Sequence, residues 1–244
     1  MRAGVSALVL SAALLLLWGV ADARRWIGDA GGVDKAFYTK YQQEVLKSRK
    51  PFAIDKGFLA PAVKAYPGST TWLDAGAGNC GTMRAVMAMG KDVKGVELAD
   101  LEKNGCKDLA QRGLVHSTSL DALPFPDRSF DVVYSFEVFE HVPESLVDAS
   151  IAELVRVARR DLFLTIAMKP SGFDPPPPAQ PKIHVTVKPR KWWDAKFAAA
   201  GCLVNHNLRA QFQGDGGRRY PKVTFFPYIC HSDDAEVAAL HTAD

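Results

Sequence analysis

The sequence has few cysteines, no run of Lys and Arg, and no glycosylation sequon. Its four cysteines, Cys80, Cys106, Cys202 and Cys230, form no C-x-x-C pair and show no ligand spacing with histidine, so we predict no metal site. The net charge is only +3 across 244 residues, which argues against a nucleic acid partner. No Asn stands in an N-x-S/T context, so passage through the secretory pathway would leave no N-linked glycan.

The cysteines are compatible with disulfides in an oxidising compartment, where four of them allow three different pairings. Cys80 lies inside a glycine-rich segment, and we interpret it as a small packing residue.

Residues 1–23 have the pattern of a targeting segment. Arg2 precedes an uncharged, Leu-rich run over residues 3–21, and Ala21-Asp22-Ala23 matches an A-x-A cleavage site. We favour a signal peptide, which predicts the secretory pathway: the lumen of the endoplasmic reticulum or Golgi, or secretion. The alternatives are a retained signal anchor, because the run is just long enough to span a bilayer, and an organelle presequence. Membrane contact is expected only for a retained anchor.

The composition is that of an ordinary globular protein, with 48% hydrophobic and 23% charged residues, and the length fits one domain with a full core. Two helical patterns occupy an N-terminal helical segment, residues 24–66. After a Pro-Gly turn, strand and helix patterns alternate over residues 67–231, and residues 232–244 are expected to be a frayed tail. Four consecutive prolines at 175–178 predict a stiff, extended loop.

This alternation predicts an α/β fold in which helices cover a parallel sheet. The strand patterns lie at residues 71–75, 93–98, 114–117, 130–136, 161–168, 202–208 and 223–229. A helix is expected over 101–112, and another follows Pro143, where apolar residues have helical spacing. Pro227 is unsuited to a central strand and suggests a bulge or an edge.

The segment T-W-L-D-A-G-A-G-N-C-G at residues 71–81 is the most informative part of the sequence. An apolar run ends at Asp74, and Gly76 and Gly78 then allow a tight turn and a close approach of the backbone to a ligand. Glu97 follows at the end of the next apolar run, where a carboxylate can accept hydrogen bonds from ribose hydroxyls. The pattern predicts a nucleoside-containing cofactor across the strand ends.

Two classes of cofactor use such a turn, and Asp74 separates them. A dinucleotide such as NAD would bring a pyrophosphate close to this carboxylate, which repels it. S-adenosylmethionine carries an ammonium and a sulfonium group and no phosphate, so an acid suits it. We therefore predict S-adenosylmethionine as the cofactor, and an NAD-dependent oxidoreductase is the alternative.

A second motif, S-L-D-A-L-P-F-P-D-R-S-F-D-V-V-Y-S-F-E-V-F-E-H-V at residues 119–142, carries a family resemblance. It resembles the class I S-adenosylmethionine-dependent methyltransferases, and within them the type 11 domain of the ubiquinone and menaquinone biosynthesis methyltransferases. That group has an L-P-F-x-D-x-S-F-D segment, an apolar strand and then E-V-x-E-H-V. The resemblance implies a Rossmann-like methyltransferase fold over residues 67–231, with a seven-stranded, mostly parallel sheet and helices on both faces.

The resemblance also assigns cofactor contacts to individual residues. Asp74, Gly76 and Gly78 would bind the methionine end of the cofactor, and Glu97 its ribose. The other expected contacts are Ser119 and Leu120 to the adenine and Phe136 to the sulfonium region. Many members of the family have an aspartate where this chain has Ser119, and Asp121 is a candidate substitute.

The implied reaction is methyl transfer to a small-molecule, lipid or glycan acceptor. His141 in the E-V-F-E-H-V motif, and His184 in a region that commonly contributes to the acceptor pocket, are the candidate catalytic residues, because histidine takes up a proton near neutral pH. A structural hydrogen bond is the alternative role for His141. A non-catalytic binding protein that keeps the fold is the alternative for the whole chain. The oligomeric state is left open.

Overall fold

The computed structural model describes residues 35–36, 38–40, 43, 57–171, 183–213 and 224–231. The signal peptide or anchor predicted for residues 1–23, the proline run at 175–178 and the frayed tail at 232–244 lie outside the described residues, so these expectations stay predictions. Within the described residues, no helix has the length and apolar character needed to cross a membrane.

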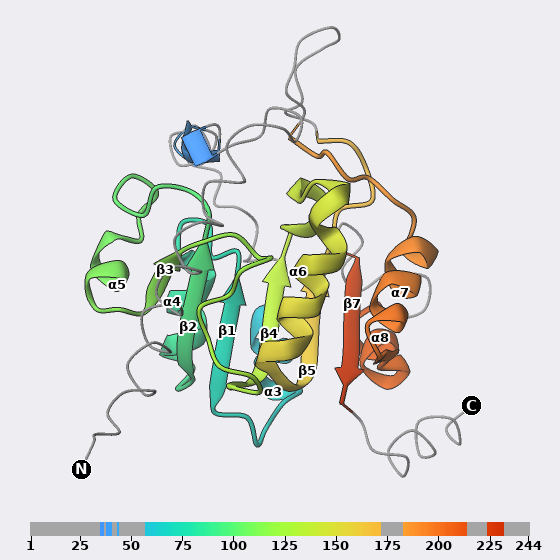
Figure 1. Ribbon diagram of the computed structural model, residues 1–244. Coiled ribbons are helices and arrows are strands. Elements are labelled where there is room, and N and C mark those ends of the chain that lie inside the picture. The colour runs from blue at the N-terminus through green and yellow to red at the C-terminus, as the bar shows by residue number, and fades with distance from the viewer. Residues whose placement is uncertain are drawn as a thin grey trace, which may run out of the picture.

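A seven-stranded sheet forms the centre of the fold (Figure 1). Its strands are β1 (Thr71–Ala75), β2 (Asp92–Glu97), β3 (Val115–Ser117), β4 (Phe130–Phe136), β5 (Ala158–Thr165), β6 (Cys202–Val204) and β7 (Phe225–Cys230). Their order is β3-β2-β1-β4-β5-β7-β6, and neighbours are parallel except where β7 pairs with β5 and β6. The prediction of an α/β fold with a seven-stranded, mostly parallel sheet is confirmed.

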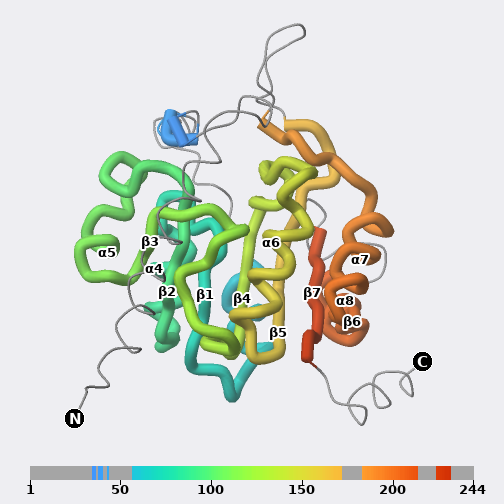
Figure 2. The backbone as a smooth tube through the Cα atoms, viewed as in Figure 1, coloured from blue at the N-terminus to red at the C-terminus, as the bar shows by residue number. Residues whose placement is uncertain are grey.

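Helices cover both faces of this sheet, as predicted. They are α3 (Leu59–Lys64), α4 (Gly81–Ala88), α5 (Lys107–Gln111), α6 (Glu144–Val157), α7 (Arg190–Ala199) and α8 (His206–Gln213), with a short 3₁₀ turn, η2 (Phe139–His141), before α6. Helices α6 and α7 pack on one face, whereas α3, α4, α5 and α8 pack on the other. Figure 2 shows α6 running across β4 and β5.

The two faces follow from the alternation of side chains along each strand. In β1, Leu73 belongs to the core under α6, whereas Trp72 belongs to the opposite core and packs against Tyr66 and Tyr134. These side chains are almost completely buried, and such burial is the main stabilising contribution to the fold. Asp74 shares the face of Trp72, which brings its carboxylate to Tyr134.

The helix expected over residues 101–112 is shorter in the structure and covers only Lys107–Gln111. Turns precede this helix because the side chain of Asn104 forms hydrogen bonds with backbone groups, and these bonds compete with helix formation. Its Nδ2 donates to the carbonyl oxygen of Gly78 at 2.6 Å, and its Oδ1 accepts from the Cys106 N–H at 3.2 Å. Asn104 therefore attaches this segment to the glycine turn.

The strand expected over residues 202–208 is wrong beyond Val204. Helix α8 begins at His206. Asn205 precedes it, and its Oδ1 accepts a hydrogen bond from the Leu208 N–H at 3.0 Å, as an N-cap residue does.

The expectation of a bulge or an edge at Pro227 is wrong, because β7 pairs in continuous register with both of its neighbours. Strand β7 lies between β5 and β6, so it is not an edge strand. However, β6 is short and its last pair joins Val204 to Tyr228. The Pro227 carbonyl oxygen faces this side and accepts from the Asn205 N–H at 3.0 Å. Proline has no N–H to return a bond to Asn205, and the pairs between β6 and β7 end one residue earlier, at Val204 and Tyr228.

Two disulfides, Cys80–Cys106 and Cys202–Cys230, account for all four cysteines. The second joins the neighbouring strands β6 and β7. The interpretation of Cys80 as a packing residue is wrong, because this buried sulfur is bonded to Cys106 and crosslinks the glycine turn to the segment after β2. Such a crosslink stabilises the fold chiefly by restricting the unfolded chain.

Candidate functional site

The sheet has a topological switch point between β1 and β4. From β1 the chain runs outward to β2 and β3, whereas β4 and β5 lie on the other side of β1. In open α/β sheets, ligands bind at the carboxyl ends of the strands beside such a point. A cavity lies here, and its lining includes all seven predicted cofactor contacts and one candidate catalytic residue: Asp74, Gly76, Gly78, Glu97, Ser119, Leu120, Phe136 and His141.

Glu97, at the end of β2, fastens the glycine turn. Its Oε2 accepts from the Gly78 N–H at 2.6 Å, and its Oε1 accepts from the Ala99 N–H at 2.8 Å. Burial raises the pKa of Glu97, and the backbone hydrogen bonds oppose that shift. Each carboxylate oxygen has a second lone pair, so Glu97 can hold the turn and still accept hydrogen bonds from a ligand.

Asp74, at the end of β1, is a buried acid with a strongly shifted pKa. Burial and the nearby charge of Glu97 raise the pKa of Asp74 to about 7, although the hydrogen bond from the Tyr134 hydroxyl, 2.9 Å from Oδ2, opposes the rise. A cationic ligand beside this carboxylate would favour its ionised form. The electrostatics of this end of the cavity therefore suit positive charge.

Gly76 brings the turn into contact with the segment after β4. Its φ is 103°, and a Cβ built on it would lie 2.5 Å from Cγ2 of Val138, so glycine is required here both for conformation and for space. Val138 lies between Glu137, which lines the cavity, and the η2 turn. The close approach at Gly76 thus connects the glycine turn to the turn that carries Glu140 and His141.

The loop between β3 and β4 forms another wall of the cavity, with Ser119, Leu120 and Asp121 in the lining. The Oδ1 atom of Asp121 is buried and accepts no hydrogen bond from the residues that the structure describes. A buried acceptor without a donor is costly. Asp121 therefore marks a place where a ligand N–H or O–H would be stabilised.

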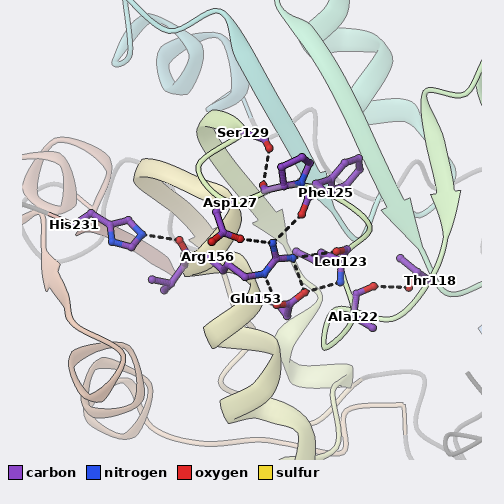
Figure 3. Close-up of polar contacts among 11 residues, drawn as sticks. Thr118, Ala122, Leu123, Phe125, Asp127, Ser129, Glu153, Arg156 and His231 are labelled. Carbon is purple, nitrogen blue, oxygen red and sulfur yellow. Dashed lines mark hydrogen bonds and ion pairs between the residues drawn. The ribbon is translucent and has the colours of Figure 1, made fainter. Parts of the chain in front are cut away.

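Arg156 on α6 holds this loop in place, as Figure 3 shows. Its guanidinium donates to both carboxylate oxygens of Glu153 at 2.6 and 2.8 Å, and to the carbonyl oxygens of Phe125 and Leu123 at 2.8 and 3.0 Å. Asp127 adds an ion pair at 2.8 Å. Glu153 in turn accepts from the Leu123 N–H at 2.8 Å. The L-P-F-P-D part of the sequence motif is therefore structural: it attaches the cavity loop to α6.

The two candidate catalytic histidines lie side by side, with ring centroids 4.9 Å apart. The His141 Nδ1 is 2.8 Å from the carbonyl oxygen of Ile183, and the His184 Nδ1 is 2.7 Å from that of Lys169. Because a carbonyl oxygen only accepts, each Nδ1 carries a proton, and in the neutral ring each Nε2 has a lone pair. Buried Glu140 lies beside them, with its Oε1 4.0 Å from the His184 Nε2.

Tyr38 covers this end of the cavity from the N-terminal helical segment. Its hydroxyl donates to the carbonyl oxygen of His141 at 2.8 Å, and its ring meets the His141 ring edge-on. Thr39 Oγ1 accepts from the Asp100 N–H at 2.9 Å nearby. In Figure 1 these described helical residues lie beyond the carboxyl ends of the parallel strands.

The family model of the methyltransferase domain matches residues 73–166, which carry most of this cavity. The matched residues are less than half of the chain, and they are similar to a methyltransferase domain. The chain is also similar to the 2-methyl-6-phytyl-1,4-hydroquinone methyltransferase of Synechocystis sp., with 34% identity over 105 residues, covering 41% of this chain and 32% of that protein. The chain thus matches about a third of the length of this curated relative.

Solved structures share the fold of this chain. The 1,6-didemethyltoxoflavin-N1-methyltransferase of Burkholderia thailandensis has a TM-score of 0.54 at 17% identity, covering 84% of this chain and 94% of its own. A SAM-dependent methyltransferase of Aquifex aeolicus has a TM-score of 0.51 at 18% identity, covering 77% and 97%. At such identities the likeness concerns the fold alone, and the predicted Rossmann-like methyltransferase fold is confirmed.

Three residues that support the candidate site are absent from the sequence predictions. The Asn104-Gly pair is a turn signal inside the expected helix, and Arg156 three residues after Glu153 is the spacing of a helical ion pair. Tyr38 has no such local signal, because 103 residues separate it from His141. The roles of the predicted site residues stay predictions, although their convergence on one cavity agrees with them.

Proposed function

We propose that this protein transfers a methyl group from S-adenosylmethionine to a small-molecule acceptor. One observation carries the proposal: three acidic side chains, Asp74, Glu97 and Asp121, line a single cavity around the glycine turn at the switch point. Acids in these places favour a cationic ligand rich in hydroxyl and amine donors, and they disfavour a pyrophosphate. The methyltransferase domain and its similarity to a hydroquinone methyltransferase support the same reaction.

The described residues fit this cofactor from one end to the other. Asp74 would lie beside its positively charged methionine end. Glu97 would accept from the ribose hydroxyls with its remaining lone pairs, while keeping the bond from the Gly78 N–H. The buried Oδ1 of Asp121 would accept from the adenine amine, so this residue would replace the aspartate that many relatives have at the position of Ser119.

The acceptor would lie at the end of the cavity formed by Tyr38, Phe136 and His141. When bound, S-adenosylmethionine supplies a methyl group on a positively charged sulfur, an intrinsically good leaving group. The protein then has to align the acceptor with that methyl group and exclude water. The Nε2 lone pair of His141 suits proton transfer from a hydroxyl acceptor, and the catalytic roles of His141 and His184 belong to this proposal.

Two other functions make different predictions. A non-catalytic protein with this fold would bind the cofactor, but it would form no S-adenosylhomocysteine when an acceptor is added. An NAD-dependent oxidoreductase would bind NAD, but the comparisons with known proteins give it no support and the buried Asp74 carboxylate opposes a pyrophosphate.

The first test is a binding titration of the purified full chain with S-adenosylmethionine, S-adenosylhomocysteine and NAD, by calorimetry and thermal shift. We expect both sulfur nucleosides to bind and NAD not to bind. Asp74→Asn and Glu97→Gln should each weaken binding by about tenfold or more, because each removes a charged contact. The control is Asp92→Asn, at the exposed opposite end of β2, which should leave affinity unchanged.

A folded protein that binds neither sulfur nucleoside would overturn the proposal. Where binding is found, release of S-adenosylhomocysteine should be measured with hydroquinones, phenols and nitrogen heterocycles as acceptors. Binding without turnover on any of these would favour the non-catalytic alternative.

We also propose an oxidising compartment of the secretory pathway as the place of action. The signal-peptide pattern and the two disulfides support it. Activity there requires import of the cofactor. Terminal sequencing of the protein secreted from eukaryotic cells would show Arg24 at its start if the segment is cleaved, whereas an intact Met1 would overturn cleavage.

A further inference from the structure

We propose that Glu140, His141 and His184 bind a divalent transition metal ion of the zinc class beside the cofactor cavity. One ligand atom from each side chain lies within 4.8 Å of the other two. Two neighbouring residues of the η2 turn thus meet a residue from a loop far away in the sequence. This proposal departs from the sequence prediction of no metal site, which considered only local spacing.

The orientation of the two histidines is that of metal ligands. Metal-binding histidines commonly donate the N–H of one ring nitrogen to a carbonyl oxygen, which directs the lone pair of the other nitrogen to the ion. His141 does this through Ile183, and His184 does it through Lys169. The His184 Nε2 lies 4.0 Å from Glu140 Oε1, and one ring nitrogen of His141 lies within 4.8 Å of the ligand atoms of both residues, so three acceptor groups come together.

The loop that carries His184 is fixed against the η2 turn before any ion binds. The Thr186 N–H donates to the carbonyl oxygen of Glu140 at 3.0 Å, and the Thr186 Oγ1 donates to that of Val142 at 2.6 Å. Thr186 itself is buried. The ligand positions are therefore set by backbone contacts on both sides, which lowers the conformational cost of binding.

The donor set selects the kind of ion. Two imidazole nitrogens suit zinc and its transition-metal neighbours, whereas Mg²⁺ and Ca²⁺ prefer oxygen ligands. The 4.0 Å between Glu140 Oε1 and His184 Nε2 is less than 1 Å wider than the separation of about 3.3 Å between ligands of a tetrahedral zinc ion with bonds of about 2.0 Å. Three protein ligands leave one coordination position open, as in catalytic zinc sites.

The open position would face the acceptor end, because His141 belongs both to the ligand cluster and to the cavity lining. One carboxylate does not balance the charge of a divalent ion, so the remaining position favours an anionic oxygen. The role of the ion rests on the proposed function, although its binding does not. With the ion bound, the lone pair of His141 serves as a ligand and not as the base, so a bound acceptor hydroxyl would lose its proton to water. Its oxygen would then form the bond to the methyl carbon while the carbon–sulfur bond breaks and leaves its electron pair on sulfur.

Cobalt binding to the full chain tests the site without cofactor or acceptor. The protein should be purified without a histidine tag, stripped with a chelator and titrated with Co²⁺, followed by visible absorption and equilibrium dialysis, with Zn²⁺ in competition. We expect one Co²⁺ per chain, displaced by Zn²⁺ and not by equal Mg²⁺. All four cysteines are in disulfides, so an absorption band from a cobalt–thiolate bond would contradict the assignment.

The decisive variant is His184→Asn. The asparagine amide can still donate to the carbonyl oxygen of Lys169 in place of Nδ1, but it has no atom in the place of Nε2. We expect the melting temperature in chelator to be preserved and Co²⁺ affinity to fall at least about tenfold. Glu140→Gln should act in the same direction. The matched control is His206→Ala, an exposed histidine at the start of α8, which should leave Co²⁺ affinity unchanged.

Failure of this inference can be told from failure of the proposed function. Co²⁺ binding by a protein that binds no S-adenosylmethionine would support the metal site and overturn the cofactor. S-adenosylmethionine binding without Co²⁺ binding, or equal Co²⁺ binding by wild type and His184→Asn, would overturn the metal site.

Discussion

The two ends of the cavity are built in different ways. At the cofactor end, Asp74 and Glu97 lie at the ends of parallel strands, and their oxygens accept from Tyr134 and from backbone N–H groups. At the histidine end, the ligand atoms come from a 3₁₀ turn and a distant loop, and hydrogen bonds to backbone carbonyls fix the rings. At the cofactor end, each carboxylate already accepts hydrogen bonds from the protein. At the histidine end, a carboxylate and two imidazole rings lie close together, and all three are hydrogen-bond acceptors.

The two ends of the cavity depend on the sequence in different ways. The cofactor end is specified by short motifs, because strand, turn and acid are consecutive in the chain. The histidine end exists only after the sheet has formed and brought the loop of His184 against the η2 turn. Substitutions should therefore affect the two ends separately, except at the contact between Gly76 and Val138, which joins them.

The largest effect should come from Gly76→Ala, which disturbs that contact. The added Cβ would lie 2.5 Å from Val138 and adopt a φ of 103°, so we expect a loss of about 3 kcal/mol in the free energy of unfolding, together with weaker binding of both cofactor and Co²⁺. Urea denaturation measures the first effect and calorimetry the second.

Gly113→Ala is the matched control for this substitution. Its φ is 65°, but no atom lies within 4 Å of an added Cβ, so only the conformational cost of about 1 kcal/mol should appear. Adding Val138→Ala to Gly76→Ala should restore part of the loss. Equal costs for the two glycine substitutions would mean that the contact with Val138 contributes nothing.

The second effect concerns the cofactor end alone and depends on pH. Because the pKa of Asp74 is raised to about 7, S-adenosylmethionine affinity should rise about tenfold between pH 6 and pH 8 as the carboxylate ionises. Asp74→Asn controls for titration of the ligand itself and should remove most of this dependence. The same dependence in wild type and variant would assign it to another group.

Ionisation of Asp74 should lower the free energy of unfolding of the ligand-free protein, although it raises the affinity for the cofactor. A carboxyl pKa raised on folding means that the folded state holds a proton that the unfolded state has lost. The contribution of protonated Asp74 to the free energy of unfolding is fully present below the ordinary pKa of 3.8, and it is lost as the pH rises through about 7. The thermal stability of Asp74→Asn should therefore decline less than that of wild type over this interval.

The smallest effect should come from Thr186→Val at the histidine end. The substitution keeps the shape of the buried side chain and removes the hydrogen bond to the Val142 carbonyl, at a cost of about 1 kcal/mol. Co²⁺ affinity should fall a few-fold, while S-adenosylmethionine affinity should not change. A change in cofactor affinity of similar size would show that the two ends are not independent.

Sequence patterns predicted the sheet well because each strand and turn is a local signal. They failed where a side chain makes a specific contact that overrides the pattern. Asn104 binds Gly78 and delays the start of the expected helix to Lys107, and Asn205 caps a helix where a strand pattern continued. Leu208 and Phe212, four residues apart and buried on one face of α8, were the available signal for that helix.

The candidate site was predictable to the extent that it is local. Asp74 and Glu97 were found through the turn and the strand ends. The juxtaposition of Glu140 with His184, and the position of Tyr38, depend on tertiary packing and no spacing encodes them. Asp121 was a candidate from the sequence, but only the structure shows that its Oδ1 is buried and without a donor among the described residues.

The Cys80–Cys106 disulfide has a practical consequence for anyone who makes this protein. The bond closes a loop between residues 26 apart, and one of its two sulfurs belongs to the glycine turn that lines the cavity. Protein synthesised in a reducing cytosol would lack this crosslink, and only hydrogen bonds such as those of Glu97 and Asn104 would hold the turn. Oxidation is then a maturation step, and preparations should be compared by their thiol content before their activities are compared.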